Sequence, residues 1–396
     1  MAPESAQVVI IGGGLEGCAA AWQLSRRGVT DILVLERDTV GGGMTGKSSG
    51  IVRCHYGVSS LAAMANYGLD VFEQAESLFG EDIGFRNTGY VVGVGQANAA
   101  ALRASLAAQQ AVGVQTEEIE AAEVAKLWPW ADLEPFAAFG WEARGGYGDA
   151  YQTAQAYAKA ARQAGVEIRQ GAEVASLKMS SDQVSGVRLA SGEEISAGQV
   201  VVATGCWSGP FLAKAGVEVP VRVHRESIVM INPGVDLGRV PVFSDLISLQ
   251  YVRPDVGGQI LFGNSDLGAP NDADPDWYPN RADEQFIERT VDKVGTRFPR
   301  LADASITTTY SGCYDVTPDW NPIISLTEVA GLVVAAGFSG HGFKISAAVG
   351  RLVADLVIDA ASSDPLVPES DFRLSRYAEG DPTVTPFPYA GAGSMR

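Results

Sequence analysis

The sequence predicts an α/β protein with two domains, in which a parallel sheet covered by helices is joined to an α+β domain built on an antiparallel sheet. Two observations predict this class. The apolar runs QVVII, QVVVATG and GLVVAAG are continuous, as in parallel strands buried on both faces, and helical patterns lie between them. From about 219 to 312, alternating strands are instead split by Pro, Asp and Gly loops, which is typical of antiparallel pairing.

The first apolar run, residues 7–11, leads into a glycine turn and then a helical pattern. Gly12, Gly14 and Gly17 have GxGxxG spacing, and the next strand, DILVLERD, ends in Glu36. Glycines let the backbone approach a pyrophosphate at the helix N-terminus, and the acidic side chain can accept hydrogen bonds from a ribose. The unit therefore predicts a Rossmann-type dinucleotide site. Because Glu36 would repel a 2′-phosphate, NAD and FAD are favoured over NADP.

A second pair of glycines, Gly93 and Gly95, lies between an apolar run and a helical pattern in YVVGVGQANAAALRASL. The third glycine position is occupied by Asn98, and no acidic strand end follows at the right distance. We therefore predict a strand-to-helix turn here rather than a second nucleotide site.

The remaining elements follow from the same patterns. Residues 151–170 have the pattern of an amphipathic helix that leads into GVEIRQG, and ADEQFIERTVDKVGTRF is predicted as a helix of the second domain. From Lys344 onward, apolar residues at helical spacing predict a last long helix. The predicted boundaries are 1–85, 150–215 and 320–380 for the dinucleotide-binding domain, 86–149 and 216–319 for the substrate domain, and 381–396 for an extended C-terminal tail on the surface.

Composition argues against several classes of function. The 396 residues are 46 % hydrophobic, enough for a large core, and carry a net charge of −18, which disfavours binding to nucleic acid. No run approaches the ~20 apolar residues of a membrane span, and MAPES lacks the basic start of a secretory signal, so a cytoplasmic protein is expected. Four cysteines without a CxxC pair and only three histidines predict neither a disulfide framework nor a metal site.

Four segments stand in order along the chain: GGGLEG with Glu36, TGKSSGIVR at 45–53, ATGCWSG at 203–209, and TPDWNPIIS followed by GFSGHGFK. Together they resemble the FAD-dependent amine and amino-acid oxidases, which include glycine oxidase, sarcosine oxidase and D-amino acid oxidase. The resemblance spans nearly the whole chain. It implies an extended FAD, with the adenosine at the N-terminal fingerprint and the flavin ring against the glycine-rich turn near the C-terminus.

The resemblance also implies a set of cofactor-binding residues drawn from these segments. Backbone N–H groups at the start of the last helix can donate to the flavin and stabilise negative charge on the reduced ring. The predicted cofactor-binding residues are Gly12, Gly14, Leu15, Gly17, Glu36, Arg37, Thr45, Lys47, Ser48, Ser49, Val174, Ala203, Thr204, Gly205, Trp207, Gly337, Gly340, His341, Gly342, Phe343 and Lys344.

Three residues are predicted at the reacting end of the site. In the sarcosine-oxidase branch an arginine and a lysine hold the substrate carboxylate, and these positions are Arg53 and Lys344 here. Two cations in an apolar pocket suit an anionic amino acid and fix its reacting carbon over the flavin. Tyr251 matches a tyrosine that faces the flavin. The structural alternatives are Arg53 paired with an acidic neighbour, Lys344 as a solvated helix residue and Tyr251 as part of the core.

Two positions depart from the family pattern. Monomeric sarcosine oxidase ties its flavin to a cysteine, whereas Gly312 occupies that position here and Cys313 lies one residue later. Non-covalent FAD is therefore expected. Phe262 occupies the position of a lysine that assists oxygen reduction in that branch, which argues against fast reaction with oxygen. Of the histidines, His55 is expected to form local hydrogen bonds and His341 to act through its backbone.

The resemblance implies oxidation of the C–N bond of a small primary or secondary amino acid, such as an N-substituted glycine. The imine product would be hydrolysed to a carbonyl compound and an amine, and oxygen would be reduced to hydrogen peroxide. The flavin carries this chemistry, so no catalytic triad is required. The alternatives are a dehydrogenase that passes electrons to a carrier or quinone, an RNA-modifying flavoprotein, which the net charge disfavours, and a non-catalytic FAD-binding protein.

Overall fold

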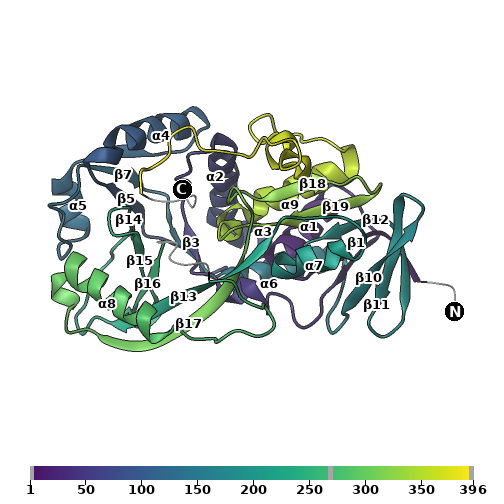
Figure 1. Cartoon of the computed structure of the whole chain (residues 1–396), viewed down its shortest axis with the longest axis horizontal. Helices are drawn as coiled ribbons and strands as arrows, with labels where there is room; N and C mark the ends of the chain where they lie inside the picture. The colour runs from purple at the N-terminus through teal and green to yellow at the C-terminus, as the bar shows by residue number, and fades with distance from the viewer. Residues whose placement is uncertain (1–3, 266–270, 392–396) are drawn as a thin grey trace.

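The computed structural model describes residues 4–265 and 271–391, and it contains two large sheets that lie side by side (Figure 1). The first sheet has the strand order β10-β11-β12-β1-β2-β9, with β19 paired to β12 and β18 to β19. The pairs along β9-β2-β1-β12-β19 are parallel. Its strands are β1 (Glu4–Ile11), β2 (Ile32–Leu35), β9 (Glu167–Arg169), β10 (Val174–Ser180), β11 (Gln183–Leu189), β12 (Glu194–Val202), β18 (Ile323–Leu326) and β19 (Leu332–Ala336).

Helices from distant parts of the chain pack on this sheet and on one another. Helix α1 contacts α6 and α9, and α2 contacts α9. Two glycines allow the close crossings. A Cβ at Gly350 of α9 would lie 2.5 Å from the carbonyl oxygen of Ala19, and one at Gly68 of α2 would lie 2.0 Å from that of Lys344. The start of α9 is therefore held firmly. The helices are α1 (Leu15–Arg26), α2 (Ser59–Glu73), α3 (Ala75–Phe79), α6 (Ala150–Gln163), α7 (Ser208–Ala213) and α9 (Gly342–Asp359).

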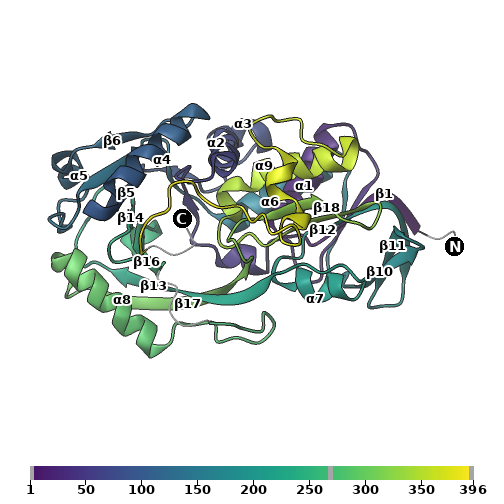
Figure 2. The ribbon, with the colours of Figure 1, turned by 45° about the horizontal axis from the view of Figure 1, so that its top comes forward.

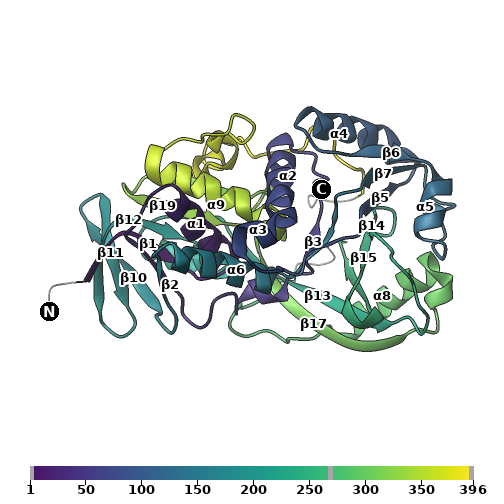
Figure 3. The ribbon, with the colours of Figure 1, turned by 180° about the vertical axis from the view of Figure 1, so that it is seen from behind.

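The second sheet has the order β17-β13-β16-β15-β14-β5-β7-β6, and α8 and α5 lie at its outer end (Figure 3). Its pairs are antiparallel, as predicted for this domain, except β14 with β5, which is parallel. The elements of this part are β5 (Tyr90–Val94), β6 (Glu117–Ile119), β7 (Ala138–Glu142), β13 (Arg222–Asn232), β14 (Val242–Asp245), β15 (Gln250–Pro254), β16 (Ile260–Asn264), β17 (Ser305–Val316), α4 (Ala99–Ala111), α5 (Ala121–Leu127) and α8 (Glu284–Arg297).

A small third sheet joins the two parts of the chain. It has the order β3-β8-β4, with β3 (Ile51–Val52), β8 (Gly146–Tyr147) and β4 (Arg86–Asn87). The short 3₁₀ helices include η1 (Met44–Lys47), η2 (Gln96–Asn98), η3 (Gly205–Trp207) and η7 (Leu374–Arg376). The predicted domain boundaries remain a prediction, since the sheets show strand partners rather than independent folding units.

The structure corrects two local predictions. The helix expected over 151–170 ends at Gln163, and 167–169 form β9. The tail expected on the surface carries a buried side chain, because Tyr389 is only 7 % exposed; residues 392–396 lie outside the described range. The strand-to-helix turn at 93–98 is present between β5 and α4. None of the described helices combines the length and hydropathy that crossing a bilayer takes.

Candidate active site

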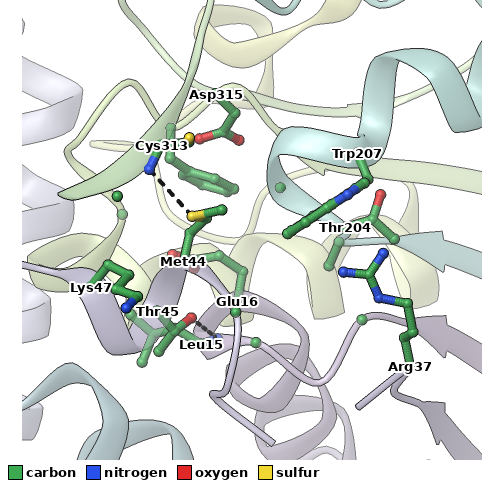
Figure 4. A pocket seen from close by; sticks show the side chains of 18 of the residues that line it. Leu15, Glu16, Arg37, Met44, Thr45, Lys47, Thr204, Trp207, Cys313 and Asp315 are labelled. Atoms are coloured by element: carbon green, nitrogen blue, oxygen red, sulfur yellow. Dashed lines mark hydrogen bonds between the residues drawn. The ribbon is translucent and has the colours of Figure 1, made fainter. Parts of the chain in front are cut away.

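A cavity of about 410 Å³ lies where β1, β2 and β12 end, at the carboxyl edge of the parallel strands, which is where α/β sheets bind ligands (Figure 4). Residues of β13, β17 and the turn before α9 complete its wall. The predicted cofactor-binding residues that line it are Gly12, Gly14, Leu15, Glu36, Arg37, Thr45, Lys47, Ser48, Ser49, Val174, Ala203, Thr204, Gly205, Trp207, Gly340, Gly342 and Phe343.

The turn between β1 and α1 depends on two glycines. Gly12 has a φ of +106°, and a Cβ there would lie 2.4 Å from the carbonyl oxygen of Ala203. A Cβ at Gly17 would lie 1.9 Å from the carbonyl oxygen of Gly12, so Gly17 shapes the turn although it does not line the cavity. Gly14 is the N-cap of α1 and offers no side-chain cap. The helix start therefore presents backbone N–H groups suited to an anion.

The carboxylate of Glu36 is fixed at the end of β2. Its Oε2 accepts a hydrogen bond from the Gly13 N–H at 2.7 Å, and its Oε1 accepts one from the Asp38 N–H at 2.8 Å. Both oxygens keep lone pairs for a further donor, because each carboxylate oxygen accepts up to two hydrogen bonds. The position and the fixed geometry support the predicted contact with a ribose.

An aromatic and ionic cluster lies beside Glu36. The Arg37 guanidinium lies 4.6 Å from the ring centroid of Trp207 (Figure 4), and both side chains donate to the Asp276 carboxylate, at 3.1 and 3.0 Å. Asp276 also lines the cavity and was not predicted. It comes from the loop between β16 and α8, far away in sequence, and no local pattern marks such a residue.

The η1 segment forms the floor of the cavity. Thr45 Oγ1 accepts a hydrogen bond from the Leu15 N–H at 3.1 Å, which ties η1 to the start of α1. The Lys47 ammonium donates to the Asn280 side chain at 3.0 Å. Met44 Sδ lies 3.2 Å from the Cys313 backbone N, a contact that Figure 4 draws as the dashed line between these two residues. Four distant segments of the chain therefore meet here.

Two buried carboxyl groups on the cavity wall were not predicted. Glu16 of α1 has a buried Oε2 without a hydrogen-bond partner among the described residues, and burial, reinforced by the charge of Asp315, raises the Glu16 pKa well above its usual value. Burial raises the pKa of Asp315 to about 6, although the N–H groups of Phe338 and Gly337 act in the opposite direction. Glu16 is visible inside GGGLEG, but the fingerprint assigns roles only to its glycines.

Arg53 and Lys344 do not line this cavity but meet beside it, near one aromatic ring. The Arg53 guanidinium lies 4.6 Å and the Lys344 Nζ 6.0 Å from the ring centroid of Tyr56. The Tyr56 hydroxyl is 3.2 Å from Nδ1 of His341, the N-cap of α9. Phe343 of the same turn lines the cavity, so the two predicted cations lie next to the end of the cavity that faces the start of α9.

Lys344 is not a solvated helix residue. It is 6 % exposed, and its Nζ lies 3.5 Å from the carbonyl oxygen of Gly340. That alternative is therefore wrong. Gly337 and His341, also predicted to bind the cofactor, support the turn from behind: the Gly337 N–H donates to the Asp315 carboxylate at 2.7 Å.

The acidic neighbour of Arg53 is Glu142 at the end of β7, but the two form no ion pair. Glu142 Oε2 accepts a hydrogen bond from the Cys54 N–H at 2.7 Å, while its Oε1 is buried without a partner among the described residues. Burial raises the pKa of Glu142 to about 7, against the lowering effects of the Cys54 N–H and the charge of Arg53. Arg53 is therefore not neutralised by a permanently ionised partner.

Tyr251 lies behind the cavity wall and is not among the lining residues. Burial raises its pKa, and hydrogen bonding with Ser49 and Tyr314, which both line the cavity, acts against that shift. A Cβ at Gly263 on the next strand would lie 2.2 Å from the Tyr251 hydroxyl. A flavin-facing Tyr251 remains a prediction, since the tyrosine on the described wall is Tyr314.

The direction of the Phe262 side chain corrects the inference about reaction with oxygen. Phe262 is fully buried in the core of the second sheet, edge-to-face with Phe298 at 5.8 Å. Leu261 packs with Tyr251 instead, because alternate residues of a strand face opposite sides. Phe262 therefore says nothing about reaction with oxygen.

Together, a Rossmann-type sheet, a helix start facing a cavity and a fixed acidic residue after β2 define a dinucleotide-binding α/β protein. No group of three His, Cys, Asp or Glu that could hold a metal occurs in the described part of the chain. The family profile described as FAD dependent oxidoreductase (DAO) matches residues 7–356. The chain belongs to this family of FAD-dependent oxidoreductases.

Individual relatives are more distant. The chain is 28 % identical over 373 residues to 4-methylaminobutanoate oxidase (formaldehyde-forming) of Paenarthrobacter nicotinovorans, covering 90 % of this chain but 44 % of that protein. It is 26 % identical over 386 residues to sarcosine oxidase subunit beta of Rhodobacter capsulatus, covering 94 % and 89 %. L-proline dehydrogenase from P. horikoshii superposes with a TM-score of 0.88 at 25 % identity, covering 96 % and 100 %.

The residues present fit FAD on observations of this structure. The α1 start offers N–H groups for a pyrophosphate, and the fixed Glu36 carboxylate offers acceptors for a ribose. A Cβ at Gly340 would lie 2.7 Å from the Tyr314 ring, so only glycine lets the backbone pass there. The Oε2 of Glu16, which has no hydrogen-bond partner among the described residues, is a buried polar atom on the wall that a bound hydroxyl group can satisfy.

Proposed function

We propose that this protein oxidises the C–N bond of a small carboxylate-bearing amine, a primary or N-substituted amino acid. The substrate loses two electrons and two protons and becomes an imine. Water then adds to the imine and releases a carbonyl compound and an amine. FAD, when bound, accepts the two electrons, and oxygen takes them up as hydrogen peroxide in the oxidase form of the proposal.

The observation that carries the proposal is the pair of buried cations beside the end of the cavity that faces the start of α9. Arg53 and Lys344 are each 6 % exposed and lie near the ring of Tyr56. Two cations held beside one aromatic ring can each donate a charge-assisted hydrogen bond to the same substrate carboxylate. Bonds from two directions would orient the amine-bearing carbon toward the cavity.

The relatives support the same substrate class. Three relatives carry names that contain an N-methylated amino acid: 4-methylaminobutanoate oxidase, sarcosine oxidase subunit beta and dimethylglycine dehydrogenase. An N-carboxymethyl amine that yields glyoxylate lies within the same chemistry.

The test is an anaerobic titration of the purified holoprotein with single amines, followed by flavin absorbance. We expect bleaching near 450 nm with at least one N-methyl or primary amino acid and none with the matching decarboxylated amine. Bleaching by both members of each pair would overturn the carboxylate as the recognised group. An absence of bleaching with every amine would favour a non-catalytic FAD-binding protein.

A dehydrogenase is the second candidate, because dimethylglycine dehydrogenase of Homo sapiens aligns with 90 % of this chain at 25 % identity, and L-proline dehydrogenase superposes on 96 % of it. Such an enzyme would pass electrons to a carrier or quinone. Turnover in air, compared with turnover with an artificial acceptor under nitrogen, separates the two. A rate at least tenfold higher with the acceptor would assign the dehydrogenase.

We further propose that FAD is bound without a covalent tether. Cys313 lines the cavity, but burial raises the pKa of its thiol to about 11, with Arg225 lowering it and Asp274 raising it. A protonated thiol is a poor nucleophile. Acid precipitation should leave the yellow flavin in the supernatant, whereas flavin fluorescence that migrates with the denatured chain on a gel would contradict this.

A further inference from the structure

The end of the described chain crosses from the first sheet to the second. Figures 1 and 2 show this yellow segment leaving the region of β18 and running to the neighbourhood of β5 and β14. We call residues 381–391 the C-terminal strap. At its start the Thr383 N–H donates to the Asp319 carboxylate at 2.9 Å, and the Asn321 side chain donates to the Thr383 carbonyl at 3.0 Å.

The other end of the strap is clasped by Asn98. The Ala390 N–H donates to Asn98 Oδ1 at 2.7 Å, and Asn98 Nδ2 donates to the Ala390 carbonyl at 3.1 Å. One side-chain amide thus satisfies both backbone groups of one residue, as a neighbouring strand would. Asn98 is 6 % exposed and sits in η2, so the glycine turn that resembles a nucleotide loop holds the strap instead.

Between these anchors the strap inserts Tyr389 into the protein. Its ring stacks on His55, with centroids 6.0 Å apart and planes 11° from parallel, and its hydroxyl lies 2.8 Å from His55 Nε2. His55 Nδ1 lies 3.2 Å from Gln109 Nε2. Because an amide NH₂ only donates, an imidazole that accepts from Gln109 at Nδ1 carries its proton on Nε2 and donates it to Tyr389.

His55 in turn contacts the predicted substrate-binding arginine. Its backbone carbonyl accepts a hydrogen bond from the Arg53 guanidinium. The position of His55 therefore helps to decide where the Arg53 charge lies, and the ring of His55 is held by Gln109 from α4 and by Tyr389 from the strap. Tyr56, the next residue, is the ring shared by Arg53 and Lys344.

We propose that the C-terminal strap belongs to the substrate-binding end of the site, and that Tyr389 is a positioning residue that fixes Arg53 through His55. Asn98 acts as the clasp that keeps the strap in place. The inference rests on the proposed function, because it assigns the strap to carboxylate recognition. It adds a part of the chain about 330 residues from Arg53, and one that none of the chemistry-bearing motifs includes.

The test measures binding of methoxyacetate, the oxygen analogue of N-methylglycine, which cannot be oxidised at a C–N bond and carries no titrating amine. Its dissociation constant comes from the change in flavin absorbance of the holoprotein. Tyr389→Phe removes one hydroxyl and keeps the stacked ring. We expect the dissociation constant to rise roughly three- to tenfold, which corresponds to the free energy of one hydrogen bond, while FAD content and melting temperature stay unchanged.

Kinetics with an oxidisable amine supply a readout that a merely structural role would not change. Tyr389→Phe should raise KM for a carboxylate-bearing amine by a similar factor and leave kcat within twofold. Asn98→Ala releases the far end of the strap without touching His55, so it should weaken methoxyacetate binding in the same way. The double variant should bind methoxyacetate no more weakly than the single variant with the larger loss, because both changes act through the same contact.

Val384→Ala is the matched control, since Val384 lies in the strap but is 72 % exposed. It should bind methoxyacetate like the wild type. Wild-type constants in both Tyr389→Phe and Asn98→Ala would overturn the inference and leave the proposed function standing. If the wild type itself binds no carboxylate and is bleached by no amine, the proposed function fails and the inference fails with it.

Discussion

The fingerprint end of the cavity and the Arg53–Lys344 cluster beside its other end bind, in our interpretation, the cofactor and the substrate of one reaction, but they are built differently. At the fingerprint end, the shape comes from backbone, and all of Gly12, Gly14, Gly17 and Glu36 fall within 25 residues. At the other end, side chains come from the segment after β3, from β7, α4 and α9, and from the C-terminal strap.

The difference explains which end tolerates change. The backbone cradle has no room for a Cβ at Gly12 or Gly17, because each would lie within 2.4 Å of a carbonyl oxygen of the turn or the sheet. A substitution in a cluster of side chains removes one interaction, and the binding free energy lost is that of a single hydrogen bond or charge. The first end should therefore respond to substitution by losing FAD, and the second by losing selectivity for carboxylates.

The largest effect is expected for Gly17→Ala. The new Cβ would lie 1.9 Å from the carbonyl oxygen of Gly12, far inside van der Waals contact, so β1 and α1 cannot keep their present distance. We expect loss of most bound FAD, measured as the flavin-to-protein absorbance ratio, together with a lower yield of folded protein. Gly295→Ala is the control, because a Cβ there meets nothing within 4 Å and the helix α8 should gain slightly in stability.

The same difference decides how much the sequence could predict. Continuous apolar strands, the GxGxxG turn and Glu36 are local patterns, and the structure has the parallel sheet and the turn that they predict. The parallel pairing of β14 with β5 could not be predicted, because no local sequence pattern indicates it. The direction of Phe262 was missed because a residue count along a distant relative does not fix which face of a strand a side chain occupies.

The residues missed in the site are those that reach it over long sequence distances. Asp276 arrives on a loop, and Tyr389 on a tail rich in Pro and Gly that resembles a surface segment by composition. Arg53 and Lys344 were indicated by resemblance to a family. Their position beside Tyr56 depends on the close crossing of α2 and α9, which rests on Gly68.

The second prediction concerns Glu36→Ala. The change removes a carboxylate that accepts from two backbone N–H groups and, in our proposal, from a ribose. We expect FAD affinity to fall by roughly a hundredfold, since hydrogen bonds to a charged group contribute about 1.5 to 3 kcal/mol. Apoprotein titrated with FAD and followed by fluorescence quenching gives the constant. The order in which amines bleach the reloaded protein should stay unchanged; a changed order would contradict the separation of the two ends.

Lys344→Met comes third and probes the other end. Methionine keeps most of the side-chain volume while deleting the charge, so FAD content should survive. We expect kcat/KM for a carboxylate-bearing amine to fall about ten- to a hundredfold, the cost of one charge-assisted hydrogen bond. An amine of similar shape without the carboxylate should be nearly indifferent. Lys126→Met, an exposed lysine in α5, should behave like the wild type; equal losses for both amines would instead place the Lys344 charge at the flavin.

The smallest effect should appear in the pH dependence that Glu142 gives to carboxylate binding. Its pKa is about 7 because of burial, so it is mostly neutral at pH 6 and mostly ionised at pH 8. Arg144, two residues along the chain, bonds Asp70 and Glu73, and burial raises the pKa of Cys54 well above its usual value, so neither titrates in this range.

Once ionised, Glu142 competes with a substrate carboxylate for the charge of Arg53. Methoxyacetate should therefore bind about fivefold more weakly at pH 8 than at pH 6, a change of about 1 kcal/mol, and Glu142→Gln should remove that dependence. Folding responds in the same direction. A carboxyl group whose pKa rises from 4.5 to about 7 on folding stabilises the protein fully below pH 4.5, and that contribution is lost as the pH rises to about 7. The Glu142→Gln variant should therefore show a flatter melting temperature between pH 5 and pH 7 than the wild type. If the variant keeps the wild-type slope of methoxyacetate binding, the pH dependence does not come from Glu142, and the proposed competition for the Arg53 charge is wrong.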